Sequence, residues 1–267
     1  FGMKRTQDNW ATQSDVSWWF NMGGAGGVAA SNEPSQFFPP IAASASGDEV
    51  YIASTFLYRR SNNAAWIRTG SNAAKTAAIA GVPITAIAVS PRDPTHVYVG
   101  ALNGTIYVSR NRGAGGSWTR IDDGHFGRPI TSIHAHPKDP NAILISQGGN
   151  SGERRRVWWC KNTSGAAGPY KWEQASGSNA VTGLQDVHTN VAVFDPDAPN
   201  SIFYAGTDIG FFYSKDGGAT WKDGNTNLGL PKVGVTAIQV VGNGVNASIY
   251  VATYGRGMWR VRYGDLP

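Results

Sequence analysis

Two histidines are spaced so that their imidazoles could act together. His134 and His136 alternate along a predicted strand, which puts both side chains on one face. Imidazole nitrogens are common zinc ligands, although a zinc site needs three or four protein ligands. The corresponding positions in the preceding sequence repeat are Ala88 and Ser90, which provide no such pair. We therefore expect packed or surface histidines, no metal site and no bound cofactor.

A short basic run stands directly before two tryptophans. Residues 153–156 read E-R-R-R, and residues 157–159 read V-W-W. Arginine beside an aromatic ring can stack on sugars, bases or phosphates, so Arg155, Trp158 and Trp159 are candidate ligand-binding residues. The alternative is a solvated hairpin tip, with both tryptophans packed on neighbouring structure.

Tryptophan is unusually frequent, with ten in the chain. Aromatic rings can bind the faces of sugars and can anchor protein interfaces. The adjacent pair Trp18 and Trp19 therefore joins the candidate ligand-binding residues. The alternative is that adjacent tryptophans cover the exposed edge of an incomplete fold.

Composition limits the class of protein. The chain has 267 residues, with 34 glycines and 14 prolines, and this turn-rich composition suits one large β domain. No apolar run approaches the length of a membrane helix, so no transmembrane segment is expected. The single cysteine, Cys160, excludes an internal disulfide. A net charge of +5 favours solubility and acidic partners, and no nucleic-acid-binding module or nucleic-acid partner is predicted.

A pattern of about ten residues recurs and ends in a P-x-x-P turn. The copies begin at residues 85, 131, 190 and 236, and the last copy is incomplete. After each turn comes a short β-branched or aromatic strand, and the four strands lie at 96–99, 142–145, 201–204 and 248–251. Short strands at a spacing of about 40 to 50 residues are typical of β-propeller blades.

The repeat predicts an all-β chain with essentially no helix. We expect about five four-stranded blades, at roughly 19–70, 83–122, 129–176, 186–225 and 234–263. Residues 1–18 are expected to continue an upstream blade, and residues 19–267 form the propeller blades. Closed propellers commonly have six to eight blades, so a larger ring of about seven is predicted. Its remaining blades would come from an upstream domain or from a partner chain.

One turn is the most specific feature of the chain. Residues 214–221 read S-K-D-G-G-A-T-W, and the defining positions are Ser214, Asp216, Gly218, Thr220 and Trp221. Serine and aspartate can bond backbone groups of such a turn, glycine allows positive φ, and tryptophan can pack across the blade. Degenerate copies have asparagine in place of the aspartate, at 60–66, 109–118 and 160–172. We therefore expect these residues to be structural.

The complete turn resembles the Asp-box of sialidase-type and related propellers, a family also known for BNR repeats. Four shorter segments, at 6–10, 21–27, 186–188 and 254–259, resemble secreted bacterial Asp-box proteins, including xyloglucan-type endoglucanases built from two propellers. The resemblance spans nearly the whole chain, but only the Asp-box itself is specific. It implies an extracellular or periplasmic protein.

The resemblance also suggests where hydrolytic chemistry would lie. Such glucanases are inverting hydrolases that need a general acid and a general base, with a water between them. Residues 207–213 resemble the context of one catalytic aspartate in that family, which makes Asp208 the best single candidate. Asp8 and Asp186 are alternative carboxylates. The segment at 21–27, which would supply a second carboxylate, contains Asn21 and Ala25 instead.

Three functional hypotheses remain. The preferred one is an extracytoplasmic propeller that acts as a recognition or scaffold domain for a protein or glycan. The second is a glycoside hydrolase with Asp208 in its site and part of that site on other sequence. The third is a structural subunit of a larger assembly. Sialidase chemistry would need an arginine triad and a tyrosine nucleophile, and no spacing here identifies them.

Overall fold

The structure is a computed structural model that describes most of the chain from residue 39 onward. The described residues are 39–62, 64, 66–69, 82–124, 126–149, 155–165, 168–179, 181–226 and 228–266, together with the backbone of two short strands. These two strands, β1 (Lys4–Arg5) and β2 (Ser14–Asp15), pair with each other. The predictions for the rest of residues 1–38 lie outside the described residues.

Five antiparallel sheets, which we call blades 1 to 5, follow one another along the chain. Blade 1 contains β3 (Ile41–Ala43), β4 (Glu49–Ala53), β5 (Leu57–Ser61) and β6 (Ile67–Thr69). Blade 2 contains β7 (Ile84–Val89), β8 (Val97–Ala101), β9 (Ile106–Ser109) and β10 (Trp118–Arg120). Blade 3 contains β11 (Ile130–Ala135), β12 (Ile143–Gln147), β13 (Val157–Cys160) and β14 (Trp172–Gln174).

The last two blades complete the described chain. Blade 4 contains β15 (Thr189–Phe194), β16 (Phe203–Thr207), β17 (Gly210–Ser214) and β18 (Lys222–Asp223). Blade 5 contains β19 (Val235–Val241), β20 (Ser248–Thr253) and β21 (Gly257–Arg262). The only helical elements among the described residues are two 3-10 turns, η1 (Gly244–Asn246) and η2 (Tyr263–Asp265).

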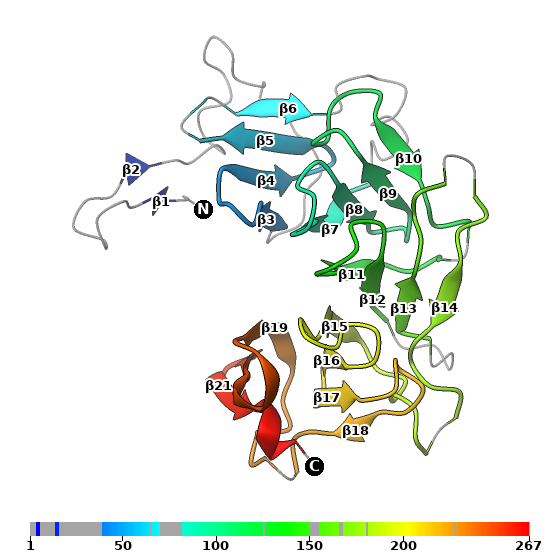
Figure 1. Ribbon diagram of the computed structural model, residues 1–267, viewed down its shortest axis with the longest axis vertical. Helices are drawn as coiled ribbons and strands as arrows, with labels where there is room; N and C mark the ends of the chain where they lie inside the picture. Colours follow the sequence, from blue (N-terminus) through cyan, green and yellow to red (C-terminus); the bar gives the residue numbers. More distant parts are fainter. Residues whose placement is uncertain are drawn as a thin grey trace.

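The blades fan out around one centre, and blades 1 and 5 form the two ends of the arc (Figure 1). The first strand of each blade, namely β3, β7, β11, β15 or β19, lies nearest the centre, and its successors follow outward. This confirms the prediction of an all-β, partial propeller with five blades. Within the described residues blade 5 has three strands, whereas each other blade has four.

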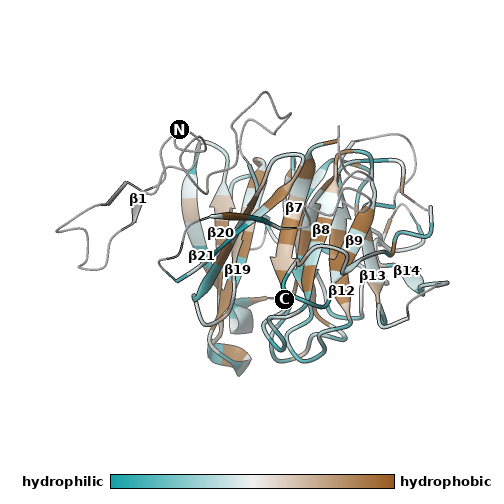
Figure 2. Cartoon of the chain, turned by 90° about the horizontal axis from the view of Figure 1, so that it is seen from above, coloured by the Kyte–Doolittle hydropathy of each residue, from teal (hydrophilic) through white to brown (hydrophobic). Residues whose placement is uncertain are grey.

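Burial explains why the middle strands of the blades are so apolar. Each inner blade is packed between two neighbours, so both faces of its second and third strands are covered. All residues of β8, β9, β16 and β17 are accordingly buried. In contrast, β7 alternates between buried and half-buried residues, as expected for a strand beside the central opening. Figure 2 shows the hydrophobic residues concentrated in the strands and the hydrophilic residues in the loops.

Apolar clusters between successive blades form the core. Tyr98 and Val108 of blade 2 pack with Ile133 and Ile145 of blade 3. Equivalent clusters join blades 1 and 2, blades 3 and 4, and blades 4 and 5. Each blade is therefore held by its neighbours rather than by a core of its own.

Candidate functional site

Antiparallel pairing gives the arc two different faces, one at each end of the strands. The hairpins between second and third strands and the links that lead to the next blade emerge together at one end, which we call the hairpin face. It comprises residues 54–56, 70–83, 102–105, 121–129, 148–156, 175–188, 208–209, 224–234 and 254–256 where they are described. The P-x-x-P turns and the turn at 214–221 lie at the opposite end, the turn face.

The turn at 214–221 is held by its own side chains. Ser214 Oγ donates to Asp216 Oδ1 at 2.8 Å and accepts from the Gly218 amide at 2.8 Å. The amide of Thr220 donates to Asp216 Oδ1 at 2.8 Å, and its hydroxyl donates to Oδ2 at 2.5 Å. Burial raises the pKa of Asp216, but these hydrogen bonds outweigh it and hold the pKa below its usual value. The carboxylate therefore stabilises the turn.

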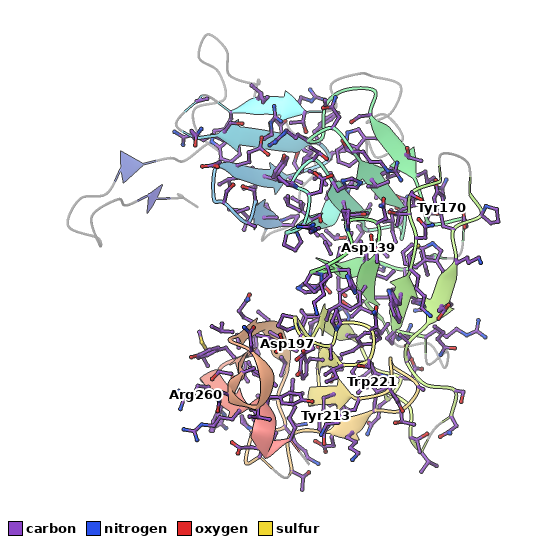
Figure 3. The ribbon with its side chains drawn as sticks, viewed as in Figure 1. Asp139, Tyr170, Asp197, Tyr213, Trp221 and Arg260 are labelled. Atoms are coloured by element: carbon purple, nitrogen blue, oxygen red, sulfur yellow. The ribbon has the colours of Figure 1, made fainter. Side chains whose placement is uncertain are left out.

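Trp221 connects this turn to the preceding blade. Its Nε1 donates to the Ala175 carbonyl at 2.9 Å, and its ring is buried between blades 3 and 4 (Figure 3). Trp172 makes the equivalent bond one blade earlier, from its Nε1 to the Ile121 carbonyl at 2.7 Å. The repeated tryptophan thus links each of these blades to the one before it.

Asp208 lies at the tip of the β16–β17 hairpin, on the hairpin face. Its side chain is exposed, and Oδ1 accepts a hydrogen bond from Asn190 Nδ2 at 3.0 Å. Its backbone amide donates to the His188 carbonyl at 3.1 Å. Antiparallel pairing places Asn190 beside this hairpin on β15, so the two polar side chains form one carboxylate and amide pair.

An exposed aromatic ring belongs to the same part of the hairpin face. Tyr254, in the β20–β21 hairpin, is 80% exposed. Its amide donates to the Gly234 carbonyl at 2.7 Å. A Cβ added to Gly234 would lie 3.7 Å from Tyr254 Cβ and 3.8 Å from Asp208 Cα, so Gly234 separates these two residues. Sequence reasoning did not select Tyr254 as a ligand-binding residue, although it named the segment that contains it.

Asp186, the second candidate carboxylate, is engaged with a buried cation. Its Oδ1 accepts a hydrogen bond from Arg156 Nη2, and the Arg156 side chain is 1% exposed. Arg156 is the largest of the fully buried side chains. The alternative of a solvated hairpin tip therefore fits Arg155, which is exposed, and does not fit Arg156. Asp8 lies outside the described residues.

The two adjacent tryptophans of β13 have different positions. Trp159 is buried between blades 3 and 4, with its ring edge-on to Phe203 at 5.4 Å between centroids. That position removes Trp159 from the surface. Trp158 is half-buried against Phe126, and its Nε1 donates to the Arg155 carbonyl at 3.2 Å. Trp18 and Trp19 lie outside the described residues.

The histidine pair also has structural partners. His136 Nδ1 accepts hydrogen bonds from the amides of Lys138 and Asp139, at 3.2 and 3.0 Å. Ser90 Oγ and Asp195 Oδ1 accept equivalent bonds in the turns of blades 2 and 4. His136 is thus one of three side chains that cap the same repeated turn. Among the described residues, no group of three histidines, cysteines or carboxylates could hold a metal ion.

The first strands of the blades line a central cavity of about 630 Å³. Its lining is mainly aliphatic, from Ile41 to Ala45 in blade 1 through to Val240 in blade 5. His134 and Gln239 are the polar side chains among the lining residues, and no carboxylate is among them. Acid–base hydrolysis with two carboxylates therefore has no support in this cavity.

His134 makes the stability of the fold depend on pH. Its Nδ1 accepts from the Phe194 amide at 3.1 Å, and burial, with a smaller contribution from His136, lowers its pKa from 6.5 to about 4. The unfolded chain therefore binds more protons between these pH values, and stability falls as the pH drops from 6.5 to 4. We expect a loss of at most about 2 kcal/mol, because the ring borders the open cavity.

Denaturant unfolding at pH 7 and at pH 4.5 measures this effect. The variant His134→Gln, which has no titrating ring, should lose less stability over this interval than the unchanged protein. The remaining dependence includes His136, because burial lowers its pKa in the same direction. Equal pH dependence in the two proteins would contradict the assignment to His134.

Comparison with known proteins shows the fold and no more. The chain matches the crystal structure of the GH74 xyloglucanase from Xanthomonas campestris with a TM-score of 0.57 at 17% identity, over 85% of this chain and 36% of that one. It matches the β-propeller domain of Cps50 (Swd1) from Myceliophteria thermophila with a TM-score of 0.57 at 11% identity, over 83% and 65%. An ancestral GH74 enzyme gives a TM-score of 0.55 at 21% identity, over 83% and 30%.

These structures support a partial β-propeller. The chain thus spans between about a third and two thirds of the length of the similar structures. No protein-family model matches the chain. No curated protein matches it either. In the part of the chain that the structure describes, no helix is long and apolar enough to cross a membrane.

Proposed function

We propose that this chain is a recognition or scaffold propeller that holds its partner on the hairpin face. The observation that carries the proposal is the arrangement of Tyr254, Asp208 and Asn190. Tyr254, which is 80% exposed, and Asp208, whose carboxylate is oriented by a neighbouring amide, both lie against Gly234. Exposed groups of this kind serve binding better than they serve the stability of the blade.

A glycan is the partner whose chemistry fits this arrangement best. A tyrosine ring offers an apolar face to the C–H groups of a sugar ring and a hydroxyl to its polar groups. Carboxylate oxygens accept hydrogen bonds from sugar hydroxyls, and an amide both donates and accepts them. A protein partner would be favoured instead if exposed apolar side chains elsewhere on this face, such as Leu102 and Val181, contributed to binding.

A location outside the cytoplasm belongs to the same proposal. The complete S-x-D-x-G-x-T-W sequence at 214–221 supports membership among secreted Asp-box propellers. The hydrogen bonds of Ser214, Asp216 and Thr220 agree with the structural role expected of such a turn. The protein would then be extracellular or periplasmic.

A glycoside hydrolase is the second candidate. Two observations favour it: Asp208 and Asp186 lie on the same face, and GH74 structures are among the similar ones. Its difficulty is Asp186, because the carboxylate is committed to the Arg156 guanidinium. A hydrolase would therefore need another carboxylate as the partner of Asp208.

Titration calorimetry with soluble β-glucans, including xyloglucan, tests the proposal. We expect Tyr254→Ala and Asp208→Asn each to weaken glycan binding about tenfold or more, or about 1.4 kcal/mol. The control is Val181→Ala, because Val181 is 91% exposed on the same face but in another loop. The assignment of these two residues to the binding site would be contradicted if Val181→Ala also lost glycan binding. It would be contradicted as well if neither Tyr254→Ala nor Asp208→Asn lost it.

The same variants distinguish the hydrolase. Release of reducing ends from the glucan is measured in parallel with binding. Hydrolysis by the unchanged protein that disappears in Asp208→Asn, while binding is kept, would replace the recognition hypothesis by the hydrolase. Binding without hydrolysis, lost in Tyr254→Ala, supports recognition.

A further inference from the structure

Among the described residues, none covers the outward side of blade 5, away from blade 4. We call this surface the open face and define it by Gln239, Val241, Tyr250, Met258 and Arg260. Val241 is 52% exposed and Met258 is 70% exposed, while Gln239 and Arg260 are exposed and Tyr250 is half-buried. Three different strands contribute to it, so the exposure belongs to a whole sheet face rather than to a loop.

The corresponding positions are buried one blade earlier. Tyr204 of β16 pairs with Tyr213 of β17, just as Tyr250 of β20 pairs with Arg260 of β21. Tyr204, Phe211 and Tyr213 are each 0% exposed, because they pack against blade 5. In Figure 3 Tyr213 lies between blades 4 and 5, whereas Arg260 lies on the outer side of blade 5. In blades 1 to 4, the surface that corresponds to the open face packs against the next blade.

The outer edge of blade 5 likewise lacks a partner strand among the described residues. In blade 4 the third strand pairs with a fourth, through Phe212 with Asp223 and Tyr213 with Lys222. No described strand pairs with the outer edge of β21, and five of its six residues are exposed. An unpaired edge of this length offers backbone donors and acceptors to a further strand.

We propose that the open face packs against a further blade of the same ring, formed by residues outside 39–266. The inference rests on the four interfaces already described. Those between blades 1 and 2, 2 and 3, 3 and 4, and 4 and 5 all use these positions. The match over 65% of a β-propeller domain agrees with a ring larger than five blades. This inference does not depend on the proposed function.

The surfaces that the described blades present to the blades before them indicate the chemistry expected of the further blade. Blade 2 presents Val97 and Val99 to blade 1, and blade 5 presents Ile249 and Val251 to blade 4. The further blade should likewise present apolar side chains from its second strand. It should also place a carboxylate or a carbonyl oxygen opposite Arg260, because a guanidinium covered without an acceptor is costly.

Thiol labelling of the native protein, as its cells produce it, tests this inference. Cys160 is buried and burial raises its thiol pKa to about 12, so it should react slowly, and the labelling of the unchanged protein is subtracted as background. We compare Met258→Cys on the open face with Val181→Cys on the hairpin face. Labelling under denaturing conditions gives the reference rate for both variants. We expect the thiol at position 258 to label at least tenfold more slowly than the thiol at position 181.

A photo-crosslinking amino acid at position 258 identifies what covers the face. The expected product joins position 258 to a peptide outside residues 39–266 that carries the repeated blade pattern, an apolar strand followed by a P-x-x-P turn. A crosslink to residues 39–266 of a second copy would overturn the inference, since the occupant would then be another copy of this chain. Equal labelling at positions 258 and 181 would overturn it too, because the face would be open in the native protein.

Discussion

Replacing Asp186 with asparagine is expected to destabilise the protein by about 3 kcal/mol. The substitution removes the charge that faces Arg156, whose side chain is 1% exposed. A buried guanidinium that loses an acidic partner is destabilised, and losses of about 3 to 5 kcal/mol are typical when one partner of a buried pair is removed. The lower end applies here, because the Asp186 side chain is 17% exposed. Denaturant unfolding at pH 7 measures the loss.

Matched variants show whether the ion pair causes this loss. Asp208→Asn changes a carboxylate on the same face that is exposed, so its effect should stay within about 0.5 kcal/mol. Removing both charges with Arg156→Met and Asp186→Leu together should recover much of the stability, since an apolar pair carries no desolvation penalty. If Asp186→Asn folds as well as the unchanged protein but loses hydrolysis of a glucan, Asp186 is a catalytic residue and the structural assignment is wrong.

Most of the fold could be predicted because the turns repeat. The P-x-x-P segments place the turn after each first strand, and the glycine hairpins place the turn after each second strand. Blades predicted at 83–122, 129–176, 186–225 and 234–263 therefore agree closely with sheets at 84–120, 130–174, 189–223 and 235–262. Blade 1 was predicted at 19–70, and its described strands run from Ile41 to Thr69.

The candidate site was harder to predict because packing between blades decides it. Arg156 belongs to a run of charges that favours solvent, yet the contact with Asp186 from a distant loop makes its burial possible. Trp158 and Trp159 alternate along one strand, and only the structure shows which of them faces blade 4. Tyr254 and Asp208 both lie against Gly234, which precedes Tyr254 by 20 residues. No spacing in the sequence indicates this proximity.

The second large effect is expected at Trp221. Trp221→Ala should cost about 3 to 5 kcal/mol, because it empties a buried site between blades 3 and 4 and removes a hydrogen bond. Trp221→Phe separates these contributions, since most of the ring packing remains while the Ala175 carbonyl loses its donor. Its expected cost is about 1 to 2 kcal/mol beyond the change in ring size.

Trp118 supplies the control for that bond. It occupies the corresponding place in blade 2 and is 3% exposed, but its Nε1 has no hydrogen-bond partner among the described residues. Trp118→Phe should therefore cost about 1 kcal/mol less than Trp221→Phe, as measured by thermal or denaturant unfolding. Equal losses would mean that ring packing alone holds the blades. A larger loss at Trp221 would show that the bond from the tryptophan to the preceding blade adds to the stability that ring packing provides in both places.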